Sequence, residues 1–465
     1  MLNGVVEATP ARTSRIALTG IGRSRLVVFS LVLSLLPIGA AAEASSEGSG
    51  LRQLIWASVF TFAGYQILMN WRLARDVLSR VNPWLIVLLL YVGATVIWSP
   101  DVGTSFRRYV QVVGVFFVAW AANCVTGRTS ILPGSMARAS LYGTLLSLAV
   151  TAAFFDFAFS DKGYRAFLAT KNLMGQFAVI VVMSAVFMFL ARPSRNRWWN
   201  ALAFGMLNVL AAPFAGEARN RPAYALYAFL FAFGVAALVL SRSATAILAS
   251  GATLVLVTLL SLARARNEVL RVLYIGAALV ATLGLFLWLL IEGLPSSSQL
   301  GSLFYDTTGK DMTLTGRTYL WQLMWGQIER HPWFGVGYGG FWLGLSGDAG
   351  QIAYLVKWGY PGQAHNGYID VLNEIGFVGM ALLLITLAVH VRRVFLLIAQ
   401  APGLGYLHLA IVLFAVMLNF TEATLLRTTS MWWMLVLISM IEVDRRVGTE
   451  FLGDERRATI SGAPA

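Results

Sequence analysis

Long apolar blocks alternate with short polar segments along most of the chain. The blocks are roughly 16 to 22 residues long, which is the length that an α-helix needs to cross the hydrocarbon core of a bilayer. We predict about twelve transmembrane helices, at residues 25–42, 52–70, 83–99, 108–124, 139–158, 173–191, 223–241, 244–263, 270–291, 367–389, 405–420 and 430–443. The pattern therefore predicts an all-α, polytopic membrane protein.

The composition agrees with this class. Hydrophobic residues make up 58% of the chain, charged residues make up 12%, and the mean hydropathy is +0.70. A soluble protein carries about twice this fraction of charged residues. The net charge of +13 could suggest nucleic acid, but most Lys and Arg residues lie in short loops between apolar blocks, so we expect no nucleic-acid partner. The single cysteine, Cys124, excludes an intramolecular disulfide.

The basic clusters predict how the chain is oriented. Cytoplasmic loops carry an excess of Lys and Arg, so WRLARDVLSR, HVRR and DRRVGTEFLGDERR should be cytoplasmic. The block at 197–222 breaks this parity, and we interpret it as a re-entrant or interfacial segment. The scheme places FRRY outside, which gives Arg107 and Arg108 a role at the outer face. The first span could also be a secretory signal, because small residues follow it, but we expect a retained helix.

The only long polar stretch is predicted to form an outer loop. The predicted regions are a cytoplasmic N-terminus (1–24), nine spans (25–292), the loop (293–366), three spans (367–443) and a cytoplasmic tail (444–465). The loop has structure of its own: Thr315 is a candidate N-cap, Pro332 ends the helix, and one face carries Leu320, Met324 and Ile328. The following GVGYGGFW lacks the Lys-Ser or Lys-Thr pair of a phosphate loop, so we expect a turn that packs closely against the bundle.

A polar stripe begins where the loop meets the next span. Asn366, Asp370 and Glu374 lie at i, i+4 and i+8 of an otherwise apolar helix, directly after His365. Carboxylates inside a span tend to face a water-filled cavity or a partner, although Asp370 and Glu374 taken singly fit interhelical hydrogen bonds equally well. His365 lies just outside the span, where water and substrate reach it. No histidine spacing or paired aspartates indicate a metal site.

Further polar residues are predicted at the same outer face: Lys171, Arg242, Arg317, Glu422 and Arg427. A single cation at such a position is more often a snorkelling side chain, but four of them around one histidine form a cationic pocket. The arginine fork pairs bidentately with phosphate oxygens and stays charged at any working pH. The pattern indicates a substrate that carries a phosphate or pyrophosphate in the outer leaflet.

Two loop motifs carry a family resemblance. TGRTYLWQLMWGQIERHPWFGVGYGGFW followed by AHNGYIDVLNEIGFVG resembles the signature of the O-antigen ligase and polymerase superfamily, and TKNLMGQ, SRSATA and NFTEA resemble its exopolysaccharide polymerase branch. The resemblance covers residues 165–430. It implies a glycosyltransferase of the bacterial inner membrane that works on the periplasmic side without metal or cofactor. The implied donor is an oligosaccharide on undecaprenyl pyrophosphate.

The resemblance and the residues suggest one mechanism. The histidine of the family's HN motif falls on His365, which would act as general base toward the acceptor sugar hydroxyl. The cations that would hold the pyrophosphate are Arg242, Arg317, Lys171 and Arg427. The residues expected to orient the ring or the acceptor are Asn366, Asp370, Glu374 and Glu422.

Alternatives remain open at this stage. A polymerase that joins repeat units and a ligase that moves finished glycan onto lipid A core need the same donor and base, and the short motifs favour the polymerase. A regulator of chain length is a conceivable partner. A transporter of lipid-linked sugar is the rival of another class, but the chain shows no internal repeat of the kind common in transporters.

Overall fold

The computed structural model describes residues 26–34, 50–125, 129–160, 163–190, 221–263, 317–345, 347–356, 359–427 and 430–461. Residues 26–34 are helical. The first elements after them are α2 (Gly50–Met69), α3 (Trp71–Arg80), α4 (Pro83–Thr95), η2 (Val96–Trp98), α5 (Val102–Asn123), α6 (Leu132–Ala153), α7 (Phe155–Ala158), β1 (Phe159–Ser160) and β2 (Gly163–Tyr164). The later elements are α8 (Lys171–Leu190), α11 (Arg221–Leu240), α12 (Ala244–Ala263), α15 (Arg317–Ile328), α16 (Gly347–Val356), α17 (Gly367–Gln400), α18 (Pro402–Leu418) and α19 (Met431–Ser461). The predicted all-α class is confirmed for this part of the chain, apart from one antiparallel pair of two-residue strands.

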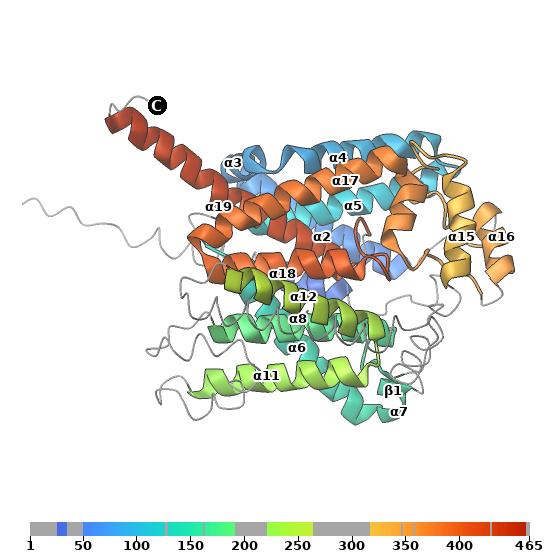
Figure 1. Ribbon diagram of the computed structural model, residues 1–465, viewed down its shortest axis with the longest axis horizontal. Coiled ribbons are helices and arrows are strands. Elements are labelled where there is room, and N and C mark those ends of the chain that lie inside the picture. Colours follow the sequence, from blue (N-terminus) through green and yellow to red (C-terminus); the bar gives the residue numbers. More distant parts are fainter. Residues whose placement is uncertain are drawn as a thin grey trace, which may run out of the picture.

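The long helices run side by side as one bundle with two distinct ends (Figure 1). One end, here called the loop end, carries α15, α16, α7 and β1, and lies to the right in Figure 1. The opposite end carries α3 and the end of α19. The segments predicted to be outer therefore gather at one end of the bundle, and two of the basic segments predicted to be cytoplasmic gather at the other.

Not every predicted span has the length and apolarity of a full crossing. Three of the described helices are long and apolar enough to cross a membrane: α8, α12 and α17. A fourth span is possible if α3 and the α4–η2 segment, which are bent by 96° relative to each other, form one broken span. Shorter apolar helices cover Gln53–Met69, Ala225–Leu240 and Pro402–Leu418. The total of about twelve stays a prediction. The predicted span at 270–291 and most of the proposed re-entrant segment lie outside the described residues.

Several helix boundaries differ from the sequence prediction. α6 begins at Leu132 rather than 139, because Glu442 Oε2 accepts the backbone N–H groups of Ile131 at 3.1 Å and of Leu132 at 3.0 Å. α17 runs to Gln400 rather than 389. α3 and α16 were not predicted as helices.

A break in α17 joins this helix to the loop. Gly376 has φ 68° and ψ −172°, so the helical hydrogen bonding is interrupted there. Loop backbone replaces the missing bonds: Val336 donates to Asn373 O at 2.9 Å, Gly337 to Glu374 O at 2.9 Å, Phe377 to Pro332 O at 2.8 Å, and Val378 to Trp333 O at 3.1 Å. A Cβ on Gly335 would lie 2.4 Å from the carbonyl carbon of Glu374. The prediction that the glycine-rich turn packs closely against the bundle is confirmed.

The predicted loop helix is present as α15. Its buried residues are Leu320, Met324 and Ile328, the three apolar positions that the spacing placed on one face. The expected cap, Thr315, lies outside the described residues. Trp321 Nε1 donates to the carbonyl of Ala364 at 2.9 Å, so α15 is attached directly to the segment that carries His365.

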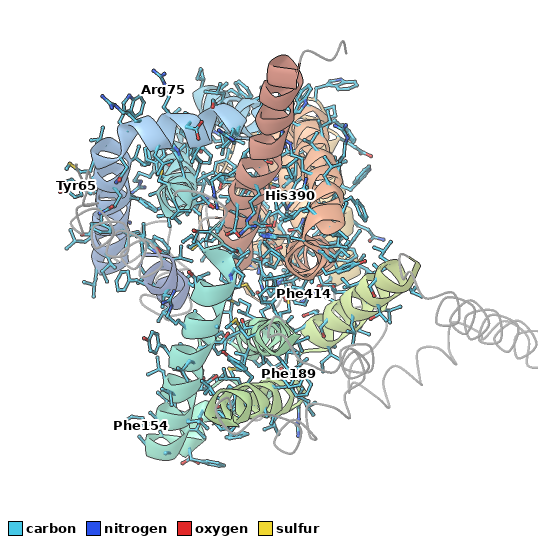
Figure 2. All side chains as sticks on the ribbon, turned by 90° about the vertical axis from the view of Figure 1, so that its left-hand side faces the viewer. Tyr65, Arg75, Phe154, Phe189, His390 and Phe414 are labelled. Carbon is cyan, nitrogen blue, oxygen red and sulfur yellow. The ribbon has the colours of Figure 1, made fainter. Side chains whose placement is uncertain are left out.

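The interior of the bundle holds two histidines, His390 and His408. His390 and His408 are both fully buried, and Ser439 Oγ lies 2.8 Å from His408 Nδ1 and 3.2 Å from His390 Nε2. Figure 2 shows His390 and Phe414 inside the bundle, whereas Phe154 lies at its edge. This position, away from the loop end, agrees with a structural role for both rings.

Candidate functional site

The turn that carries His365 is held from both sides. His365 has a φ of 50°, a conformation that is uncommon for residues other than glycine. On one side, Asn366 Oδ1 caps α17 by accepting the N–H groups of Tyr368 at 3.0 Å and Ile369 at 3.3 Å. On the other side, the Ala364 N–H donates to both carboxylate oxygens of Asp370, at 3.1 and 3.2 Å. These hydrogen bonds therefore hold the backbone of the turn from which the imidazole extends.

Glu422 is the centre of the contacts around His365. Its Oε2 lies 3.6 Å from His365 Nδ1, and its Oε1 lies 3.5 Å from Arg317 Nη2. Asn172 Nδ2 also donates to Oε1 at 2.9 Å. Because Glu422 is 7% exposed, these contacts form in a largely buried environment. One carboxylate thus brings together side chains from the beginnings of α8 and α15 and from the segment before α17.

Backbone contacts set the position of this carboxylate. Glu422 lies in the turn between α18 and α19, where Arg317 Nη1 donates to Thr421 O at 2.9 Å. The neighbouring Ala423 N–H donates to Gln363 Oε1 at 3.2 Å, and Gln363 Nε2 lies 3.4 Å from His365 Nδ1. The turn and the histidine segment are therefore joined by Gln363 as well as by Glu422.

Two further predicted cations border the same place. Lys171, the first residue of α8, donates from Nζ to the carbonyl of Arg242 at 3.5 Å. Arg242 is exposed in the turn between α11 and α12 and has a φ of 48°. Ser243 Oγ donates to Asn172 Oδ1 at 3.3 Å, which connects this turn to Glu422. We call His365, Glu422, Arg317, Asn172, Lys171 and Arg242 the histidine cluster.

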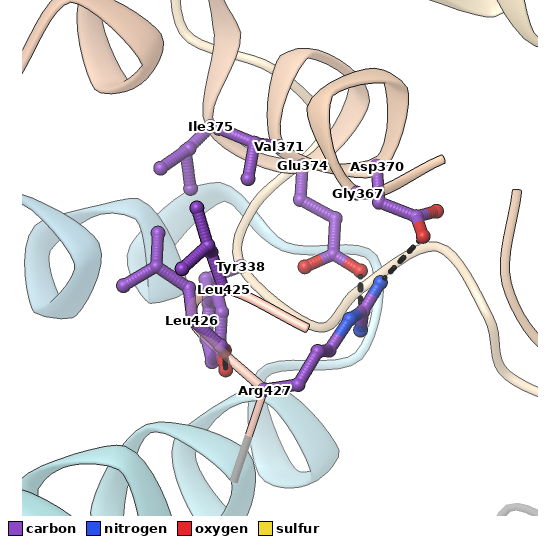
Figure 3. A pocket seen from close by; sticks show the side chains of 9 residues that line it. All are labelled: Tyr338, Gly367, Asp370, Val371, Glu374, Ile375, Leu425, Leu426 and Arg427. Carbon is purple, nitrogen blue, oxygen red and sulfur yellow. Dashed lines mark hydrogen bonds and ion pairs between the residues drawn. The ribbon is translucent and has the colours of Figure 1, made fainter. Parts of the chain in front are cut away.

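Arg427 lies in a second group, which we call the Arg427 clamp and which consists of Arg427, Asp370 and Glu374. Arg427 Nη2 lies 3.1 Å from Asp370 Oδ2, and Nη1 lies 3.2 Å from Glu374 Oε1 (Figure 3). The sequence named Asp370, Glu374 and Glu422 together as carboxylates that orient the ring or the acceptor. The carboxylate beside the ring is Glu422, and those of Asp370 and Glu374 contact Arg427.

The environment of the clamp is enclosed and strongly polar. Burial acts to lower the pKa of Arg427, but the carboxylates of Glu374 and Asp370 outweigh it and raise the pKa above its usual value. Burial also raises the pKa of the neighbouring Tyr338 phenol, whose hydroxyl donates to Leu426 O at 2.5 Å. Both groups therefore keep their protons at any physiological pH.

Arg108 was expected to have a role at the outer face, and the structure places it at the loop end. Its Nη1 donates to Gly339 O at 2.5 Å and its Nη2 donates to Trp342 O at 2.9 Å. The arginine therefore attaches the start of α5 to the glycine-rich turn.

Sequence reasoning placed Asn172 at the outer start of a span, within the TKNLMGQ motif, and did not single out Gln363. Gln363 stands two residues before His365, and this proximity was the only signal for it in the sequence. Among the described residues, no group of three or more His, Cys, Asp or Glu side chains is arranged to hold a metal ion.

Fold and site define a helical membrane protein with a cation-rich polar site at one end of the bundle, built around a histidine and a carboxylate. A family model described as O-antigen ligase matches residues 228–384, which include Arg242, Arg317 and His365. The exopolysaccharide production protein ExoQ of Rhizobium meliloti (strain 1021) is 24% identical over 307 residues, covering 65% of this chain and 63% of the relative. The chain is thus similar to a family described as O-antigen ligase and to an exopolysaccharide production protein.

Proposed function

We propose that the protein is a glycosyltransferase of the bacterial inner membrane that polymerises oligosaccharide repeat units carried on undecaprenyl pyrophosphate. The observation that carries the proposal is the histidine cluster, in which His365 and Arg317 both contact Glu422. Lys171 and Arg242 border these residues at the loop end, where Lys171 Nζ donates to the backbone carbonyl of Arg242. The loop end would face the periplasm.

The cations of the histidine cluster suit a pyrophosphate. Lys171, Arg242 and Arg317 supply three positive charges, and Glu422 supplies one negative charge, so the cluster has an excess of positive charge. Cations placed where negative charge develops stabilise the transition state more than the bound substrate. Here the developing charge is that of the departing pyrophosphate.

His365 would act as the general base. It accepts the proton of the acceptor hydroxyl while that oxygen forms a bond with the anomeric carbon of the donor. The bond between the anomeric carbon and the pyrophosphate oxygen breaks on the opposite face, and its electron pair leaves with the pyrophosphate. Glu422, 3.6 Å from His365 Nδ1, would stabilise the imidazolium that forms. This single displacement inverts the anomeric configuration.

A ligase that transfers glycan to lipid A core is the second candidate. The family model named for O-antigen ligase supports the ligase, and the likeness to an exopolysaccharide production protein supports the polymerase. The two reactions share donor chemistry and differ in the acceptor, so the glycans that accumulate distinguish them.

The test is to delete the gene, return wild type, His365→Ala or His331→Ala, and analyse both surface polysaccharide and lipid-linked glycans. His331 is the matched control, because it is an exposed histidine in the same loop. A polymerase predicts single repeat units on the lipid carrier and no polymer with His365→Ala, and normal polymer with His331→Ala. Long glycan that stays on the carrier would identify the ligase. Normal polymer from the His365→Ala strain would refute the assignment of the base.

A further inference from the structure

We propose that the Arg427 clamp binds no substrate and is a positioning device, which fixes both the His365 turn and the glycine-rich turn of the loop. The inference rests on the proposed function, because it assigns Arg427 a different role in the same reaction from the pyrophosphate contact that the sequence suggested.

The first arm of the clamp reaches the candidate base. Asp370 Oδ2 forms an ion pair with Arg427 Nη2 at 3.1 Å. Its other oxygen, Oδ1, accepts a hydrogen bond from the indole Nε1 of Trp342 at 2.8 Å. The same carboxylate accepts the N–H of Ala364, the residue before His365. Since His365 has a φ of 50°, its backbone needs such support to keep an uncommon conformation. Removing Arg427 would leave a buried carboxylate uncompensated at the base of this turn.

The second arm reaches the glycine-rich turn. Glu374 Oε1 forms an ion pair with Arg427 Nη1 at 3.2 Å, and Glu374 Oε2 accepts a hydrogen bond from the backbone N–H of Gly339 at 3.1 Å. The carbonyl of Gly339 accepts a hydrogen bond from the guanidinium of Arg108. The turn is thus held through both its N–H and its C=O. One guanidinium therefore connects the two segments that border the site, which are separate in sequence and both packed on α17.

Charge distinguishes the clamp from the histidine cluster. Around the clamp, Arg427 and Arg108 supply two positive charges, and Asp370 and Glu374 supply two negative charges. The surroundings are therefore neutral, and a pyrophosphate would meet two carboxylates there. The histidine cluster has three cations against one carboxylate and is the better site for an anion.

The small volume of the pocket beside Arg427 also indicates that the clamp does not bind a pyrophosphate. The pocket beside Arg427 is lined by Tyr338, Gly367, Asp370, Glu374 and Leu426, among others, and its volume is about 10 Å³ (Figure 3). A water molecule needs about 10 to 15 Å³ measured in the same way. A pyrophosphate group is several times larger and does not fit beside the clamp.

The test uses purified full-length protein and the undecaprenyl-pyrophosphate-linked oligosaccharide extracted from the deletion strain. We expect Arg427→Gln and Asp370→Asn to lower kcat at least about 10-fold while the donor KM stays within about 2-fold, since each leaves a buried charge uncompensated. Arg317→Gln should instead raise the donor KM. The control is Arg330→Gln, an exposed arginine of the same loop whose Nη1 lies 3.7 Å from Asp348, and it should behave as wild type.

A second readout does not depend on turnover. Hydrogen exchange of the peptide spanning residues 363–368 should accelerate in Arg427→Gln and Asp370→Asn, and stay unchanged in Arg317→Gln. The proposed positioning role is refuted by a higher donor KM with unchanged kcat in Arg427→Gln, or by unchanged hydrogen exchange in both clamp variants. If the wild-type protein does not turn over the substrate, the proposed function is refuted. The hydrogen-exchange measurement still tests whether the clamp holds the His365 turn. If Arg427→Gln does not fold, Asp370→Asn alone decides it by the same two criteria.

Discussion

Glu422→Gln offers the sharpest test of the histidine cluster, because it removes one charge and little else. The glutamine amide oxygen can still accept the hydrogen bond that Asn172 donates to Glu422 Oε1 at 2.9 Å. The change therefore keeps the shape of the site and removes the negative charge beside His365 and Arg317. If Glu422 stabilises an imidazolium during the reaction, kcat should fall.

The expected size follows from the geometry. Unit charges 3.6 Å apart, the separation of His365 Nδ1 and Glu422 Oε2, attract by about 5 kcal/mol at an effective dielectric constant near 20. The imidazole is 20% exposed, so solvent reduces this value. We expect about 1 to 2 kcal/mol to remain, which corresponds to a fall in kcat of about 5- to 30-fold.

The donor KM should respond differently. Arg317 loses the carboxylate 3.5 Å from its Nη2 and becomes more available to the pyrophosphate, so the donor KM should stay constant or decrease. The assay is steady-state turnover of lipid-linked oligosaccharide at varied donor concentration, with the exposed Glu329→Gln as control. Wild-type kcat in Glu422→Gln, or an increased donor KM with unchanged kcat, would refute this account of the carboxylate.

Two further predictions concern the fold. Gly376→Ala should lower the melting temperature by several degrees or prevent folding, because its Cβ would lie 2.3 Å from Trp333 O, whereas Gly403→Ala, with no atom within 4 Å, should not. Asp101 caps α5, and the Thr104 N–H holds its pKa below the usual value. The contribution of this cap is present above the pKa of the unfolded chain and is lost as the pH falls through the lowered pKa. The melting temperatures of wild type and Asp101→Ala should therefore differ at pH 7 and converge in acid.

Apolar runs located most of the helices that the structure describes. The prediction for 244–263 coincides with α12, and those for 52–70 and 173–191 lie within two residues of α2 and α8. α3 was missed because WRLARDVLSR appears as a basic loop, although it buries Ala74 and Val77. A ten-residue amphipathic segment carries too weak a signal to be separated from a charged connection.

The break in α17 could not be predicted. Residues 367–389 appear as one continuous apolar helix, and a glycine within a span is common in membrane proteins. The interruption at Gly376 depends on backbone groups of Pro332 and Trp333, which are more than forty residues away in sequence. Local propensity contains no information about such a partner.

The polar stripe illustrates what spacing can establish about the site. The i, i+4 relation placed Asp370 and Glu374 on one face of α17, and a single guanidinium indeed contacts both. The sequence did not identify this partner as Arg427, because two carboxylates facing one side fit a substrate cavity and a buried ion pair equally well. The choice between these depends on which cation the α18–α19 turn brings to them.

That turn explains why the two groups of charges can perform different tasks within a few residues of each other. Glu422 and Arg427 stand five positions apart in the connection between α18 and α19, and they have opposite surroundings. Glu422 is one carboxylate among cations, and Arg427 is one cation between carboxylates. The same connection therefore places a negative charge beside the candidate base and a positive charge beneath the turn that holds it. A shift of this connection would disturb both at once, so changes in it should affect the reaction more than changes to any single exposed cation.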